Sequence, residues 1–242
     1  MEEIILKNIS NDLWVAEQAQ KYNGLEVGTR MTVVRLKDNR IMLISPIKLN
    51  DELVNELNKL GTVSYIVAPN LMHHLYLEAC VSAFSSAKVY VASGLEEKYK
   101  NLVKVNVLEK TAPKEWAGCV ALQYFHGFAV MELKGARLIN EVVFFHKASQ
   151  TLVLTDTAYN IGRKSHFLTK CVTFLLGSYK KLGPTLAEKI ASKDKAALLA
   201  SYQEIMEWPF EKVIMAHGEI VESGGKVKFT KGYNWLLRSN IV

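Results

Sequence analysis

The chain has 242 residues, of which 49% are hydrophobic and 22% are charged. That length suits one α/β domain, and that balance is typical of a globular protein with a sizeable core rather than of a disordered chain. The net charge of +6 comes mainly from scattered lysines. Nucleic-acid sites more often combine arginines with aromatic residues on one face, so we do not expect a nucleic-acid partner.

Membrane-spanning and secreted classes are also disfavoured. No stretch approaches the roughly 18 consecutive apolar residues of a transmembrane helix. The acidic start, Met1–Glu3, does not resemble a secretory signal. Cys80, Cys119 and Cys171 are far apart and form no C-x-x-C pair, so neither a disulfide framework nor a zinc ribbon is indicated. We expect reduced thiols and a cytoplasmic location.

The N-terminal part of the chain has the pattern of strands with tight turns. Residues 30–36 and 40–44 are apolar, β-branched runs on either side of a polar turn, which predicts an antiparallel hairpin. Asn50 is typical of a helix N-cap and Gly61 of a helix end, and apolar residues at helical spacing lie between them. A helix over this segment is therefore expected.

Strands and helices alternate in the next segment. A short strand is expected at residues 63–67, and a helix is expected to begin near His73 or His74 and to end at Phe84. Another strand follows at residues 88–92. This alternation favours parallel strand pairing with helices packed on the sheet.

The second half of the chain returns to β structure. Its apolar runs predict strands at residues 119–124, 142–146, 151–155 and 212–216. Helical spacing before the last strand predicts a helical insertion at about 160–207, and a closing helix is expected at 226–237. Two β-rich halves, each followed by helices, favour one domain over residues 1–242. We expect a four-layer αββα sandwich, in which two mixed sheets pack face to face beneath outer helices.

Four side chains with metal-binding chemistry follow predicted strands: His73, His74, Asp156 and His217. In layered α/β folds, polar groups from the ends of strands meet on a rigid frame. Two or three imidazoles and a carboxylate suit zinc, iron or manganese, with an open position for water. Taken singly, each residue is also explained as a helix cap, a turn or a surface residue. Their order and their shared placement favour a metal site.

These residues and their neighbours resemble the metallo-β-lactamase superfamily. The resemblance rests on His73-His74 after a strand and loop, on Leu-Thr-Asp156 and on Ala-His217-Gly. An uncharacterised branch, known only as a domain of unknown function with a metallo-hydrolase-like fold, is similar in further segments: residues 29–33, 45–46, 67–70 and 140–146. The resemblance implies an αββα fold and a metal-dependent hydrolase.

The superfamily's main metal motif, H-x-H-x-D-H, is incomplete in this chain. With His74 as its last histidine, the motif puts Pro69 and Leu71 at its first two histidines and His73 at its aspartate. The histidine that the superfamily has before its middle hairpin is absent from residues 135–139. The resemblance therefore implies that one metal site is lost and that a two-metal mechanism is not expected. It implies a remaining single-metal set of His73, His74, Asp156 and His217.

Two functions remain open. The first is a mononuclear metal-dependent hydrolase of an unknown small molecule, with one zinc, iron or manganese ion on His74, Asp156 and His217. His73 would then be a fourth ligand or a catalytic proton shuttle. The second is a metal-free pseudo-enzyme that serves as a binding or interaction module, in which these side chains hydrogen-bond one another. A third interpretation is a membrane-surface or partner-binding protein that uses the basic helices at 165–206. The sequence indicates neither the substrate nor the oligomeric state.

Overall fold

The computed structural model describes residues 4–101, 104–116, 118–132 and 134–237, so Met1–Glu3 lie outside the described residues. The larger sheet consists of β1 (Leu6–Ser10), β2 (Leu13–Gln18), β5 (Thr29–Arg35), β6 (Arg40–Ile44), β7 (Thr62–Ala68), β8 (Lys88–Val91) and β9 (Val105–Val107). Its strand order is β1-β2-β5-β6-β7-β8-β9. The strands from β1 to β6 pair antiparallel and those from β6 to β9 pair parallel.

Helices α1 (Asp51–Leu60), α2 (Leu77–Ala83) and α3 (Glu96–Tyr99) connect the parallel strands. The predicted hairpin is confirmed, because β5 and β6 are antiparallel neighbours in register from Thr32↔Ile44 to Arg35↔Ile41. The predicted cap of α1 is also confirmed. The Asn50 side chain accepts a hydrogen bond from the backbone N–H of Leu53 at 2.8 Å, which satisfies a donor that the first helical turn leaves free.

The second sheet consists of β10 (Val120–Phe125), β13 (Glu141–His146), β14 (Thr151–Val153) and β15 (Lys212–Ile214), in the order β10-β13-β14-β15. Helices α4 (Phe167–Leu175), α5 (Leu186–Ala191) and α6 (Lys195–Met206) lie between β14 and β15 in the chain, and α7 (Gly225–Leu237) follows β15. Two small hairpins complete the described elements: β3 (Lys21–Tyr22) with β4 (Leu25–Glu26), and β11 (Ala129–Glu132) with β12 (Gly135–Leu138). None of the described helices is long and apolar enough to cross a membrane.

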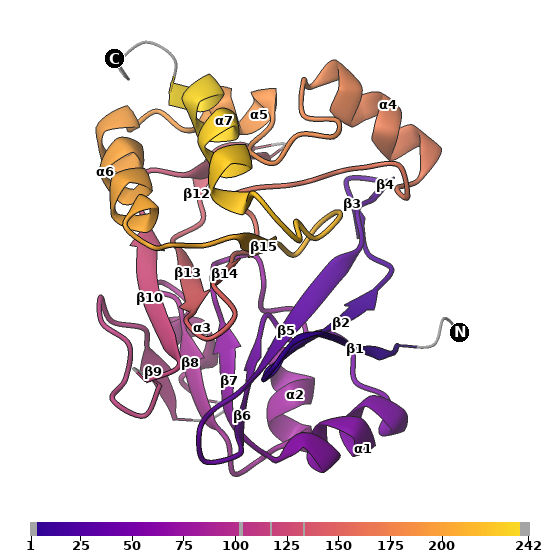
Figure 1. The fold of residues 1–242 in the computed structure, drawn as a ribbon, viewed down its shortest axis with the longest axis vertical. Coiled ribbons are helices and arrows are strands. Elements are labelled where there is room, and N and C mark those ends of the chain that lie inside the picture. Colours follow the sequence, from indigo (N-terminus) through magenta and orange to yellow (C-terminus); the bar gives the residue numbers. More distant parts are fainter. Residues whose placement is uncertain (1–3, 102–103, 117, 133, 238–242) are drawn as a thin grey trace.

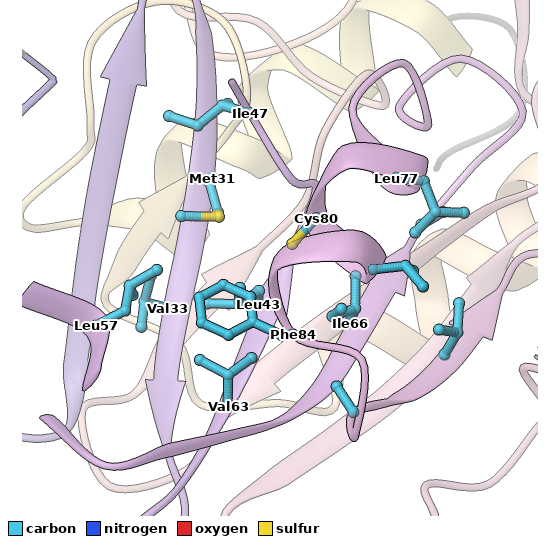
Figure 2. Close-up of a cluster of buried hydrophobic side chains, with 14 of the residues drawn as sticks. Met31, Val33, Leu43, Ile47, Leu57, Val63, Ile66, Leu77, Cys80 and Phe84 are labelled. Atoms are coloured by element: carbon cyan, nitrogen blue, oxygen red, sulfur yellow. The ribbon is translucent and has the colours of Figure 1, made fainter. Parts of the chain in front are cut away.

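The two sheets and the helices outside them form four layers (Figure 1). Three apolar cores lie between these layers. The middle core joins the sheets, with Met42 and Tyr65 of one against Val142 and Phe144 of the other. The second core packs α1 and α2 on the outer face of the larger sheet, where Figure 2 shows Cys80 and Phe84 over Met31, Val33 and Leu43. The third packs α6 and α7 on the second sheet. Fully burying one such aliphatic side chain stabilises the folded state by about 1.5–3 kcal/mol. Many such side chains lie between each pair of layers, so their burial holds the layers in this order.

The start of α2 differs from the prediction. The sequence favoured a helix from His73 or His74, but α2 begins at Leu77 and the preceding residues 70–76 form bends and turns. The cause is the Asn70 side chain, whose Oδ1 accepts from the backbone N–H groups of Met72 at 2.8 Å and of His73 at 2.7 Å. A local side-chain bond of this kind competes with helix formation. These two bonds to Asn70 turn the chain back over the edge of the sheets.

Candidate metal centre

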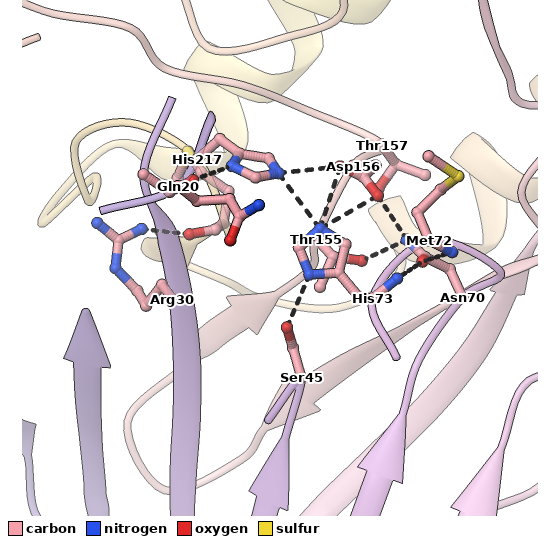
Figure 3. Close-up of polar contacts among 12 residues, drawn as sticks. Gln20, Arg30, Ser45, Asn70, Met72, His73, Thr155, Asp156, Thr157 and His217 are labelled. Carbon is pink, nitrogen blue, oxygen red and sulfur yellow. Dashed lines mark hydrogen bonds and ion pairs between the residues drawn. The ribbon is translucent and has the colours of Figure 1, made fainter. Parts of the chain in front are cut away.

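Three of the four predicted residues meet at one edge of the two sheets (Figure 3). His73 lies in the turn after β7, Asp156 follows β14, and His217 follows β15. The Nε2 atoms of His73 and His217 are 3.2 Å apart. The Asp156 Oδ1 atom is 3.3 Å from each of them. Parallel pairing of β14 with β15 brings the last two residues together, because equivalent strand ends share one edge.

His74 does not join this group. Its Nδ1 atom lies 2.6 Å from the Tyr99 hydroxyl, which in turn donates to the His74 carbonyl oxygen at 3.1 Å. Burial, together with the charge of Lys98, lowers the pKa of His74. The sequence included both histidines in the ligand set, whereas the geometry brings only His73 to Asp156 and His217.

The second nitrogen of each histidine is held by an oxygen atom. His217 Nδ1 lies 2.6 Å from the carbonyl oxygen of Gly28. A carbonyl only accepts, so Nδ1 carries the hydrogen and Nε2 presents a lone pair to Asp156. His73 Nδ1 lies 2.8 Å from the Ser45 hydroxyl oxygen, which has the capacity to accept in the same way. When both imidazoles carry their hydrogen on Nδ1, the three atoms that face one another are all acceptors: His73 Nε2, His217 Nε2 and Asp156 Oδ1.

Three acceptors this close repel one another unless a cation or a proton lies among them. Zinc bonds to histidine nitrogen and carboxylate oxygen are about 2.0–2.2 Å long, and a tetrahedral arrangement with such bonds separates the ligand atoms by about 3.3–3.5 Å. The separations of 3.2 and 3.3 Å lie close to that spacing. Two imidazoles and one carboxylate match known zinc sites and also the ligand set of non-haem Fe(II). The residues present therefore fit a single divalent ion.

Asn70 connects the His73 turn to the acidic side of the site. Its side chain is fully buried. The Nδ2 group lies 2.8 Å from Asp156 Oδ2 and 3.0 Å from Glu141 Oε2. This contact holds the Oδ2 atom of Asp156, while the Oδ1 atom lies 3.3 Å from the Nε2 atoms of both histidines.

Glu141 shapes the turn that carries Asp156. Its carboxylate is fully buried and accepts from the backbone N–H groups of Thr155, Asp156 and Thr157 at 2.8, 2.7 and 3.2 Å. It also accepts from the Thr157 hydroxyl at 2.8 Å. The chain thus folds tightly after β14 and directs the Asp156 side chain toward the histidines.

Arg30 holds the loop that carries His217. This arginine is only 7% exposed, and its guanidinium donates to the carbonyl oxygens of Met215 and Gly218, the latter at 2.6 Å. Glu17 accepts from the Nε atom of Arg30 at 2.7 Å. The two carbonyls lie on either side of His217, so the guanidinium fork fixes the backbone on both sides of the ligand.

The sequence matches one family over most of its length. A family model described as a domain of unknown function (DUF4336) matches residues 10–181. The chain belongs to the DUF4336 family. No curated protein matches this sequence.

Solved metallo-β-lactamases share the fold of this DUF4336 protein. One from Pontibacter korlensis aligns with a TM-score of 0.62 and 15% identity, over 98% of this chain and 100% of its own. Another, from Hirschia baltica, aligns with a TM-score of 0.63 and 9% identity, over 99% and 100% of the two chains. The metallo-β-lactamase FIM-1 from Pseudomonas aeruginosa in its mono-zinc form aligns with a TM-score of 0.58 and 11% identity, over 97% and 93%. The predicted αββα architecture of the metallo-β-lactamase type is confirmed.

Charges within the DUF4336 site shift the pKa values of two of its members. Burial by itself would raise the pKa of Asp156, but the charge of His73 and the hydrogen bond from its imidazole outweigh it and hold that pKa far below its usual range. Burial would lower the pKa of His73, yet the charge of Asp156 outweighs it and raises that pKa. Without a metal, the group therefore favours an ionised carboxylate beside a protonated imidazole.

An apolar cavity opens above the three residues. Its volume is about 320 Å³, and His73, Asp156 and His217 all line it. The walls come from the β3–β4 hairpin, β11, α4 and α5, and include Tyr22, Val27, Val130, Val172 and Leu176. Tyr159 lies beside the site, with its ring centroid 6.0 Å from that of His217. A small, mostly apolar cavity with a few polar groups at one place is the usual form of a ligand site.

Sequence reasoning did not assign a role to the residues that position the ligands. These are Gly28, Arg30, Ser45, Asn70 and Glu141. Four of the five lie within the segments that carry the family resemblance, 29–33, 45–46, 67–70 and 140–146. The one sequence signal for these residues was a polar side chain at the end of an apolar run. That signal does not identify a role, because the residues they contact lie far away in the sequence.

Proposed function

We propose that this DUF4336 protein is a mononuclear metal-dependent hydrolase acting on a small molecule, with His73, Asp156 and His217 as the ligands of one divalent ion. The observation that carries the proposal is the triangle of three acceptor atoms separated by 3.2 and 3.3 Å. The hydrogen bonds that the far nitrogens of the two imidazoles make to the Gly28 carbonyl oxygen and the Ser45 hydroxyl add support, because metal-binding histidines almost always have such partners.

The reaction class follows from the ligand set and the fold. A divalent ion on three protein ligands supplies Lewis-acid catalysis and lowers the pKa of water toward about 7. The chain contributes orientation: Gly28 and Ser45 fix the imidazoles, and Asn70 fixes the carboxylate. The walls of the cavity bind the apolar part of a substrate and exclude bulk water. That FIM-1 has a mono-zinc form supports a single ion in this fold.

Metal analysis of purified protein tests the proposal. The protein is purified without chelator and without a nickel column, and zinc, iron and manganese are measured by mass spectrometry. We expect about one ion per chain, and its loss in the variants His73→Ala and His217→Ala. His74→Ala is the matched control, since this neighbouring histidine contacts Tyr99 instead of the site. No metal in the wild-type protein would contradict the proposal, as would loss of metal in His74→Ala alone.

A metal-free binding module is the second candidate. It is favoured by the raised pKa of His73 beside Asp156, because one proton on that imidazole satisfies the buried carboxylate without any ion. The cavity would then bind its ligand with no chemistry. Folded wild-type protein that contains no metal, and whose melting temperature does not rise when zinc, manganese or Fe(II) is added, would support this candidate over the hydrolase.

A further inference from the structure

Helix α4 packs on one side and is exposed and apolar on the other. Its inner side lines the cavity with Thr169, Val172 and Thr173, and Leu176, the residue after the helix, lines it too. On its outer side, four large apolar side chains are between 52% and 79% exposed: Phe167, Leu168, Phe174 and Leu175. Spacings of one, seven and eight residues put these four on one face of a helix. The outer face therefore presents an apolar surface directly behind the wall of the cavity.

Little in the local sequence stabilises α4 as a free helix. It has nine residues, no side chain caps its N-terminus, and it has neither acidic residues in its first turn nor basic residues in its last. Short helices without these features depend on packing of their apolar faces. Only the inner face of α4 packs against the cavity.

Other exposed apolar side chains come from the remaining walls of the cavity. Leu75 and Met131 line it and are 67% and 37% exposed. On α5, Leu186 and Ile190 are 41% and 56% exposed, and the adjacent Ala187 lines the cavity. Apolar side chains that gather around an apolar opening mark an interaction surface. We call the exposed residues of α4 and α5 the α4–α5 face: Phe167, Leu168, Phe174, Leu175, Leu186 and Ile190.

Basic residues are frequent in the segment that contains this face. From Arg163 to Lys195 the chain has eight basic and two acidic residues, which gives this segment the same net charge, +6, as the entire chain. Exposed basic pairs lie just before and after α4: Arg163 with Lys164, and Lys180 with Lys181. Of the two acidic residues, Glu188 is buried and Asp194 caps α6. The segment that contains the α4–α5 face therefore has a net positive charge at its surface.

We propose that the α4–α5 face docks on an anionic lipid surface. An apolar helical face bordered by lysine and arginine is the usual form of a helix that lies in a membrane interface. The basic residues are attracted by the negative potential of the lipid headgroups. Pairing with a second copy through the same face would bring two segments of charge +6 together, which their repulsion opposes.

The position of α4 also indicates the class of substrate, a step that rests on the proposed function. The same helix forms the outer apolar face and a wall of the cavity that contains His73, Asp156 and His217. Docking through the outer face of α4 therefore places the apolar cavity next to the lipid surface, with this one helix as the wall between them. The substrate is an amphiphile with an apolar chain, taken from the lipid surface.

Sedimentation with lipid vesicles tests the docking. The wild-type protein should sediment with vesicles made of equal parts phosphatidylcholine and phosphatidylglycerol, and far less with phosphatidylcholine alone. The double variant Phe174→Gln/Leu175→Gln should bind the anionic vesicles at least tenfold more weakly. Lys180→Glu/Lys181→Glu should weaken binding about twentyfold or more, since one basic residue near an anionic leaflet contributes about fivefold. Val227→Gln is the control. Val227 is an exposed apolar residue as well, at 59%, but it lies on α7 and outside the α4–α5 face.

Three outcomes would overturn the docking proposal. They are no sedimentation of the wild-type protein with the anionic vesicles, unchanged binding of the Phe174→Gln/Leu175→Gln variant, and a wild-type dimer in solution that this variant disrupts. Circular dichroism and an unchanged urea-unfolding midpoint establish that each variant is folded. The lipid measurement needs no bound metal, so a protein that binds vesicles but no metal refutes the hydrolase and leaves the docking intact.

Discussion

Replacement of Asn70 by alanine tests how the site is held together. The side chain is fully buried, and its Oδ1 atom accepts from the backbone N–H groups of Met72 and His73. Its Nδ2 group contacts the carboxylates of Glu141 and Asp156. In Asn70→Ala, two backbone donors lose their acceptor and two buried carboxylates lose a donor.

The expected cost follows from these four contacts. A buried donor or acceptor left without a partner costs about 1–3 kcal/mol, and hydrogen bonds to charged groups lie at the upper end. Relaxation and water entry reduce the total, so we expect a loss of about 4–6 kcal/mol in the free energy of unfolding. For a chain of 242 residues, about 1 kcal/mol shifts the melting temperature by about 2–4 °C. The melting temperature of Asn70→Ala should therefore fall by about 10–20 °C.

The assay is urea unfolding followed by circular dichroism, with chelator present so that no metal contributes. Asn160→Ala is the matched control, because the Asn160 side chain makes one bond, to the Glu219 carbonyl oxygen at 2.7 Å. It should cost about 1 kcal/mol. If Asn70→Ala were no more destabilising than Asn160→Ala, the reasoning about the buried network would be refuted.

Three further predictions concern other parts of the account. Arg30→Lys should weaken metal binding about 10–100-fold in a chelator competition, since Arg30 fixes the backbone around His217, whereas Glu17→Gln should change it less than twofold. Burial lowers the pKa of His146 below 6.5, so the stability that its neutral form contributes is present above about pH 6.5 and lost as the pH falls; His146→Gln should flatten that loss in urea unfolding. Gly232→Ala should destabilise the fold by about 3 kcal/mol or more, because its Cβ atom would lie 2.2 Å from the Leu182 carbonyl oxygen.

Each of these has an outcome that contradicts it. Equal metal affinities of Arg30→Lys and Glu17→Gln would show that the guanidinium fork does not position His217. An unchanged pH profile in His146→Gln would remove His146 as a cause of acid lability. For the glycine, the comparison is Gly118→Ala, whose Cβ atom would meet only the end of the Lys37 side chain at 3.6 Å. Equal stability of the two glycine variants would contradict the close approach at Gly232.

Local sequence signals predicted the elements that depend on local chemistry. The cap at Asn50 and the end at Gly61 gave the bounds of α1, because both signals act within one helical turn. Strand β12 was not predicted. All four of its residues are exposed, so no alternation of buried and exposed side chains marks it. Its pairing with β11 is decided by the hairpin and the surrounding structure instead of by the strand's own sequence.

The candidate site was predicted as a region and not as a set of contacts. Their positions directly after strands predicted correctly that Asp156 and His217 lie close together. Which of His73 and His74 faces them depends on the Asn70 turn and on Tyr99, which lies 25 residues beyond His74. Glu141 has the sequence pattern of a strand residue, and its function in the Asp156 turn becomes visible only when β13 and β14 pair. Such contacts between distant residues are set by packing, which periodicity does not encode.

The most direct test of the metal site is an anomalous difference map from crystals grown with zinc. We predict one peak about 2.0–2.2 Å from the Nε2 atoms of His73 and His217 and from a carboxylate oxygen of Asp156. Zinc-saturated crystals with no peak among these three residues, or with the peak on His74, would contradict the account.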